Sequence, residues 1–168
     1  MSKMKEIRIE KITMNIGSGK DTGRLEKAMK LLEMLTSMKP VKTFSKKRIP
    51  AWGLRPGMPI GCKVTVRRGA DELLKRLLDA VEFKLDGKQF DDYGTFSFGI
   101  HEYIDVGGLE YDPEIGIMGL QVCVTLERRG YRIKRRKMLK TTPGKKHIIK
   151  KQDALEFIQS NFKVRVEA

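Results

Sequence analysis

The chain has 168 residues, of which 40% are hydrophobic, and its 35 Lys and Arg against 21 Asp and Glu give a formal net charge of +14. This size and composition predict one compact domain with a hydrophobic core over residues 1–168. The absence of any run of about 18 apolar residues excludes a membrane span. The cysteines, Cys62 and Cys123, form no CxxC pair, so a reduced cytoplasmic setting is favoured over a disulfide framework.

The first predicted element is a strand over residues 7–16. Its apolar side chains alternate, but the alternation shifts by one residue between Ile9 and Ile12. A shift in a period-two pattern indicates a β-bulge, here near Glu10 and Lys11. One face of the strand would then carry Ile7 and Ile9, and the phase-shifted part would bury Ile12, Met14 and Ile16.

A helix is predicted after the turn at residues 17–19. Asp21 or Thr22 would cap its N-terminus, and Pro40 ends it. Its apolar residues recur at helical spacing, which predicts that one side of the helix packs on the core. These residues are Leu25, Met29, Leu32 and Leu35.

A short extended piece at residues 41–44 leads into a basic loop over 45–59. A second long strand is predicted over residues 60–68, and Gly69 ends it. Its alternation places apolar side chains on the core side and polar ones on the other side. The core side comprises Ile60, Cys62, Val64 and Val66, and the outer side comprises Gly61, Lys63, Thr65 and Arg67.

The second half of the chain begins with an amphipathic helix over residues 71–83, built on Leu73, Leu74, Leu77, Leu78 and Val81. An acidic stretch follows, with short strands expected at 95–98 and 103–106. A third long strand is predicted over 117–127, then a basic irregular tail segment over 128–151, a helix over 152–162 and a last strand over 163–167. This order predicts an α+β fold, in which helices cover one face of an antiparallel or mixed sheet and leave the other free for a ligand.

The charge is segregated along the chain. Residues 34–70 hold nine Lys or Arg and residues 128–151 hold twelve, with no acid in either stretch. Residues 86–114 carry a net negative charge instead, with eight acidic residues and one lysine. Basic groups this dense repel one another unless a polyanion neutralises them, so nucleic acid is the favoured partner. The alternatives are a basic surface that serves solubility and an anionic membrane surface, which is much less favoured.

Motifs for nucleotide, metal or catalytic chemistry fail on spacing. The Gly17-Ser18-Gly19-Lys20 run is not a phosphate loop, because Met14 and Asp21 stand where that motif needs glycine and a hydroxyl residue. The cysteines and the two histidines, His101 and His147, lack metal-ligand spacing, and no nucleophile and base are paired. We therefore expect no catalytic residue, no metal and no cofactor.

The outer side of the predicted strands fits RNA. Lys63, Thr65 and Arg67 would project together, and Thr13 and Asn15 would join them from the first strand. Lysine, threonine and asparagine side chains suit contact with the backbone of folded RNA, whereas the alternative is a merely solvated face. The basic and aromatic residues of the 45–59 loop are Lys46, Lys47, Arg48, Trp52 and Arg55. Trp52 either inserts beside a nucleic acid or packs against the protein as an anchor for the loop.

Several motifs, in register from about residue 7 to 127, resemble one family. Residues 55–67 read RPGMPIGCKVTVR, residues 12–19 read ITMNIGSG, and residues 90–102 contain FD, YG, FGI and E in order. Together with Lys39-Pro40 and Lys42, this series is similar to the fifth large-subunit ribosomal protein family, which binds 5S rRNA. The basic segment 128–151 resembles archaeal and eukaryotic members.

The resemblance implies a curved antiparallel sheet with helices on its convex side and 5S rRNA on its concave face. It also implies attachment of 5S rRNA to 23S rRNA, beside the other large-subunit proteins of the central protuberance. The loop 45–57 would touch P-site tRNA, and the protein would bridge to a small-subunit protein. From charge complementarity, we expect the acidic stretch 86–114 to meet that basic neighbour. The residues expected at rRNA are Thr13, Asn15, Gly17, Lys42, Lys63, Thr65, Arg67, Arg128, Arg129, Arg132, Arg135 and Arg136.

Two other classes of function remain as alternatives. An RNA-acting enzyme, or a helper of one, would need a catalytic cluster that the sequence does not show. A non-specific nucleic-acid chaperone would show low complexity, whereas this chain has well-formed amphipathic elements. Both are less favoured than a structural rRNA-binding protein.

Overall fold

A computed structural model describes residues 3–167 and divides the chain into two compact units. Unit 1 comprises the N-terminal residues up to 12, residues 67–98 and the chain from 123 onward. Unit 2 comprises residues 13–66 and 99–122. The strands pair in the order β2-β3-β1-β6-β5 in an open antiparallel sheet, to which both units contribute, and the α+β prediction is confirmed.

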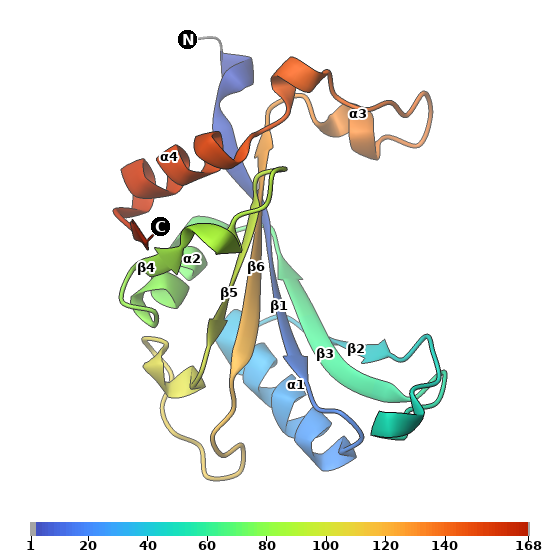
Figure 1. Cartoon of the computed structure of the whole chain (residues 1–168). Coiled ribbons are helices and arrows are strands. Elements are labelled where there is room, and N and C mark those ends of the chain that lie inside the picture. Colours follow the sequence, from blue (N-terminus) through green and yellow to red (C-terminus); the bar gives the residue numbers. More distant parts are fainter. Residues whose placement is uncertain (1–2, 168) are drawn as a thin grey trace. The chain divides into compact units, whose positions relative to one another are not determined.

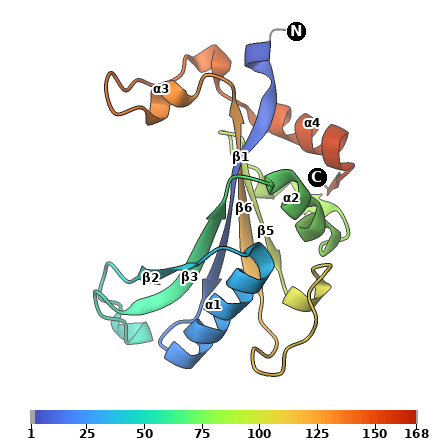
Figure 2. The same cartoon turned by 180° about the vertical axis from the view of Figure 1, so that it is seen from behind.

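Unit 2 holds the C-terminal part of β1 (Ile7–Gly17), then α1 (Thr22–Thr36), β2 (Val41–Phe44), the short 3-10 helix η2 (Pro50–Trp52) and β3 (Pro59–Val66). Helix α1 packs against β3 and lies across one face of these strands (Figure 2). Asp21 is its N-cap, because its carboxylate accepts hydrogen bonds from the backbone N–H groups of Gly23 and Arg24. The helix buries Leu25, Ala28, Leu31, Leu32 and Leu35, whereas Met29, predicted to point inward, is only partly buried.

Among the described residues, unit 1 holds three α-helices, which Figure 1 labels: α2 (Ala70–Asp79), the four-residue α3 (Arg132–Arg135) and α4 (Lys151–Phe162). The strands β5 (Thr95–Ile100) and β6 (Leu120–Arg128) contribute parts to this unit. Two short strands, β4 (Lys84–Asp86) and β7 (Arg165–Glu167), form a separate parallel pair. Short 3-10 helices lie at Lys3–Lys5, Gly87–Gln89 and Lys145–His147, and the core takes Leu73, Leu74, Leu77, Leu78, Ile149, Ala154, Ile158 and Phe162.

Most predicted elements are present, although the strand predicted over 117–127 begins at Leu120. Four larger differences are found. The predicted strand at 103–106 is wrong, because Tyr103–Asp105 form the 3-10 helix η4 around the buried Tyr103 ring. The helix predicted over 71–83 ends at Asp79, since Glu82 and Phe83 take left-handed backbone conformations. Strand β4 was not predicted at all. The basic segment 128–151 contains α3 and a 3-10 turn instead of being irregular throughout.

The predicted phase shift in the first strand is visible in its burial. Ile7 and Ile9 are partly buried, and full burial at every second position begins with Ile12. On β6, the predicted inward residues Leu120, Val122, Val124 and Leu126 are all buried. Within residues 3–167, no helix is both long and apolar enough to cross a membrane.

Candidate nucleic-acid interface

Unit 2 has an open face on the side of its strands away from α1. On β1 and β3 the buried residues alternate with polar ones, so that Met14, Ile16, Cys62 and Val64 point toward the core. The intervening side chains therefore lie on the other side of the strands. We call this surface the open face, and it comprises Thr13, Asn15, Lys63 and Thr65, of which Lys63 is exposed and the other three are partly buried.

A hollow of about 370 Å³ lies at one end of this face. Asn15 and Gly17 of β1 line it together with Gly99, His101 and Gln121. A Cβ atom added at Gly17 or Gly99 would meet no atom within 4 Å, so the strand backbone is bare here. A phosphate backbone could therefore approach the main chain closely. Of the residues that line the hollow, only Asn15 and Gly17 were predicted from the sequence to contact rRNA.

Lys42 does not join the open face. In the antiparallel pairing of β2 with β3, Lys42 lies opposite Cys62, and Val41 lies opposite Lys63. Directly opposed residues point to the same side of a sheet, so Lys42 shares the side of the buried Cys62. This register places Lys42 and Lys63 on opposite sides of the sheet, and the expected contact of Lys42 with rRNA stays a prediction.

The loop between β2 and β3 is ordered by its own backbone. Ser45 N–H donates to Met58 O at its base, and Ile49 and Leu54 exchange two backbone hydrogen bonds of 3.0 Å near its tip. Leu54 is buried as the anchor, while Trp52 is 66% exposed. Of the two alternatives for this tryptophan, the exposed one holds. The predicted cations around it, Lys46, Lys47, Arg48 and Arg55, are all exposed.

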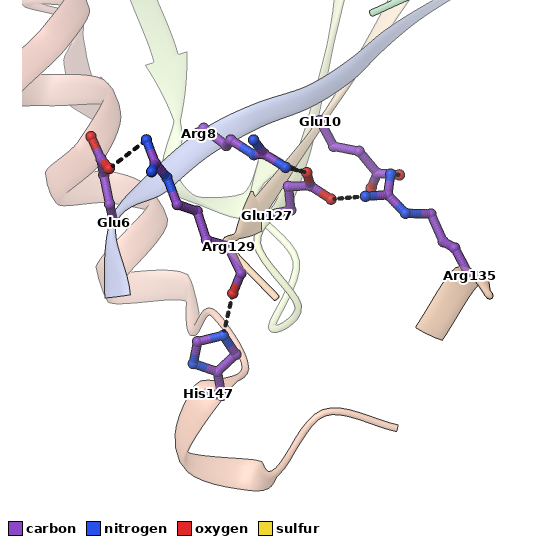
Figure 3. Close-up of polar contacts among 7 residues, drawn as sticks. All are labelled: Glu6, Arg8, Glu10, Glu127, Arg129, Arg135 and His147. Atoms are coloured by element: carbon purple, nitrogen blue, oxygen red, sulfur yellow. Dashed lines mark hydrogen bonds and ion pairs between the residues drawn. The ribbon is translucent and has the colours of Figure 1, made fainter. Parts of the chain in front are cut away.

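The predicted basic residues of unit 1 fall into two groups. Three arginines are held by carboxylates: Arg128 by Asp153 at 2.9 Å, Arg129 by Glu6 at 3.2 Å, and Arg135 by both Glu10 and Glu127 at 2.9 Å. Figure 3 shows the last two arginines beside Arg8, whose guanidinium also bonds Glu127. Exposed, and not in an ion pair with any residue that the structure describes, are Arg67, Arg132 and Arg136.

The ion-pair cluster of Arg8, Glu10, Glu127 and Arg135 was not predicted from the sequence. Two signals pointed to it: charged residues at every second position from Glu6 to Glu10, and Glu127 placed directly after a buried leucine. Glu127 is only 3% exposed. A buried carboxylate needs charged partners, and the two arginines supply them.

The acidic stretch is divided between the units and partly neutralised. In unit 2, Lys30 Nζ lies 3.0 Å from Asp112 and 2.6 Å from Glu114. The hydrogen bond from the Glu114 backbone N–H, followed by that from Lys30, holds the pKa of Asp112 below its usual value. The hydrogen bonds to Glu114 and Asp112 raise the pKa of Lys30. Asp91 and Asp92 belong to unit 1 and are exposed.

Chemistry beyond binding finds no support in the described residues. Burial raises the pKa of the Cys62 thiol to about 11, which keeps it protonated and unreactive at neutral pH. Within residues 3–167, no three His, Cys, Asp or Glu side chains are grouped as a metal site would require. The interface offers cations, hydroxyls, amides and bare backbone, which are groups that bind.

Comparison with known proteins places these features in one family. The family model "Ribosomal protein L5" matches residues 2–55, and the model of the C-terminus of the same ribosomal family matches residues 59–157. A "Large ribosomal subunit protein uL5" of Nanoarchaeum equitans is 47% identical over 165 residues, which cover 97% of both chains. The proteins of the same name from Sulfurisphaera tokodaii and Methanococcus maripaludis strain C5 are each 46% identical, and the matches cover 97% of this chain and 93% and 92% of theirs. The chain therefore belongs to the ribosomal L5 family, whose members are structural and not enzymatic.

Proposed function

We propose that this protein, which is a structural constituent of the large ribosomal subunit, binds 5S rRNA through the open face of unit 2. The observation that carries the proposal is the separation of the two sides of β1 and β3. One side is buried, with α1 packed on β3, and the other side carries Lys63 together with hydroxyl and amide side chains. By binding 5S rRNA, the protein helps to attach it to 23S rRNA in the central protuberance, among the other proteins there.

The chemistry of the open face suits the backbone of a folded RNA. Lys63 supplies a cation for a phosphate, and Thr13, Thr65 and Asn15 supply short polar groups for phosphate oxygens and ribose hydroxyls. The bare backbone at Gly17 lets the RNA approach without a side chain in between. Such contacts read the shape of the RNA, which is how proteins recognise double-stranded RNA.

Binding to 5S rRNA and to unrelated RNAs of similar length, measured by filter binding at several salt concentrations, tests this proposal. We expect tighter binding to 5S rRNA, and we expect Lys63→Ala to weaken it and to reduce the salt slope by about one unit. Lys27→Ala is the matched control, because Lys27 is an exposed lysine of unit 2 on α1 and not on the open face. Equal affinity for every RNA, with Lys63→Ala like wild type, would refute the proposal.

We propose that the loop between β2 and β3 contacts P-site tRNA. Its exposed Trp52 stands among four exposed cations on an ordered loop, which suits stacking on a base or ribose beside phosphates. In large subunits reconstituted with Trp52→Ala, we expect P-site tRNA affinity to fall by about tenfold, while Trp52→Phe keeps most of it. 5S rRNA binding should not change, and unaltered tRNA affinity for Trp52→Ala would remove the loop from this role.

We also propose that the acidic stretch 86–114 meets a basic protein of the small subunit, as charge complementarity suggests. Asp91 and Asp92 are exposed acids of this stretch that make no ion pair with a described residue. Reversing both charges, Asp91→Lys with Asp92→Lys, should slow subunit joining and weaken its salt dependence, as measured by light scattering. Joining at the wild-type rate would count against this contact.

A further inference from the structure

Unit 1 contains a groove that the open face of unit 2 does not include. We propose that this groove is a second RNA site, which takes an unpaired nucleotide with its phosphate among lysines and its base stacked on Tyr93. The inference rests on the proposed function in one respect, namely that the partner is RNA. It adds a binding site in unit 1 and the RNA structure that this site selects.

The groove has a volume of about 710 Å³, and every residue that lines it belongs to unit 1. A volume in this range holds a ligand the size of a nucleotide and is much larger than an inorganic phosphate needs. Its walls come from β1, β5, β6, α3 and the segment that follows α3. Four of its cations, Lys11, Arg67, Lys134 and Lys140, form no ion pair with a residue that the structure describes.

The acids in the groove do not cancel these cations. Glu10 and Glu127 line it, but Arg135 lies 2.9 Å from a carboxylate oxygen of each. The Nε atom of Arg8 lies 2.9 Å from the other oxygen of Glu127. Two guanidinium groups therefore neutralise two carboxylates, and the positive charge of Lys11, Arg67, Lys134 and Lys140 remains for a ligand.

Hydroxyl and aromatic groups complete the groove. Thr95, Thr125, Thr141 and Thr142 line it and offer hydroxyls to phosphate or ribose oxygens. Tyr131 is fixed in the wall, since its hydroxyl donates to the His147 carbonyl and its ring lies edge-on to the imidazole. In contrast to the partly buried Tyr131, Tyr93 is 70% exposed.

An exposed ring beside cations favours an unpaired base. Within a duplex, each base is already stacked on its neighbours and cannot lie on a protein side chain. Single-stranded segments leave bases free for aromatic stacking, while their phosphates still require cations. The open face of unit 2 is suited to RNA backbone, and the groove of unit 1 is suited to a nucleotide outside a helix.

Fluorescence anisotropy with the full chain and two labelled RNAs tests the proposal: an unstructured single-stranded heptamer and a blunt-ended duplex stem without a loop or any unpaired base. Tyr93→Ala should weaken binding of the heptamer by about tenfold and leave stem binding unchanged. Tyr93→Phe keeps the ring and should bind as wild type. Lys140→Ala should weaken heptamer binding and lower its salt slope, whereas Lys63→Ala should weaken binding of the stem more than of the heptamer.

Heptamer binding unchanged by both Tyr93→Ala and Lys140→Ala would overturn the proposal, as would an equal loss of heptamer and stem in both variants. Since Tyr93 is mostly exposed, Tyr93→Ala should unfold at the wild-type temperature. Lys140→Ala is a second, independent test, because it changes a different side chain of the groove. The outcome is separable from that of the 5S rRNA assay. A protein without preference for 5S rRNA could still show the heptamer pattern, and a 5S-specific protein could lack it.

Discussion

Replacing Gly61 by alanine is expected to destabilise unit 2 by about 1–3 kcal/mol. A Cβ atom at this position would lie 2.5 Å from the backbone oxygen of Ile16 and 3.3 Å from the Cα atom of Gly17. Both contacts are with main-chain atoms of β1, which cannot rotate away as a side-chain end could. The strands must therefore separate locally, at the end of the open face where Asn15 and Gly17 lie.

Urea unfolding followed by circular dichroism measures this loss of stability, and Gly99→Ala is the matched control. Gly99 is also a strand glycine of unit 2, but a Cβ atom there would meet nothing within 4 Å. Its substitution should change the free energy of unfolding by less than about 0.5 kcal/mol. If both alanine variants were equally stable, the close approach of β1 and β3 at Gly61 would be contradicted.

Replacing Glu127 by glutamine is expected to destabilise unit 1 by about 1–3 kcal/mol. The neutral amide no longer balances Arg8 and Arg135, and it must place an NH2 group where a carboxylate oxygen now faces a guanidinium. The cost stays below that of a fully buried pair, because both arginine side chains are about half exposed and can turn to water. Arg135 belongs to α3, so the basic segment 128–151 loses an anchor.

Thermal unfolding and limited trypsin digestion together measure this effect. Glu127→Gln should unfold at a lower temperature and should be cleaved faster within residues 128–151 than wild type. The control is Glu6→Gln, which also removes a carboxylate from an arginine but at an exposed pair, where the cost should be below about 0.5 kcal/mol. Equal behaviour of the two variants would show that burial of Glu127 does not matter.

Local pattern was sufficient for the main elements of this fold. The stripe of leucines in α2 and the alternation along β3 and β6 are set by which residues must face the core, and each is visible within about ten residues of sequence. The alternation also placed Lys63 and Thr65 together correctly, since neighbours two apart on a strand share a side. The short strand β4 escaped prediction because its pairing partner is β7, which lies at the other end of a long sequence separation.

The individual roles of the basic residues required the tertiary structure. Arg128 and Arg132 look alike in the sequence, but Arg128 is held by Asp153 while Arg132 is exposed. Lys42 and Lys63 are both exposed strand lysines, and only the pairing of Lys42 with Cys62 shows that they lie on opposite sides. Such differences depend on which residues become neighbours after folding, and a sequence pattern does not contain that information.

By itself, the sequence determined the α+β class, the family and the segregation of charge toward a polyanion, because hydrophobic period, motif order and charge runs are local properties. Only the tertiary structure decided which cations remain available to that polyanion. Arg8 and Arg135 form ion pairs with Glu127. Lys63 on the open face and Lys134 and Lys140 in the groove form no such ion pair with a described residue. The physical reason is that a buried carboxylate must be paired with a positive charge. In the folded protein the nearest guanidinium groups neutralise it, so they are not free cations for RNA.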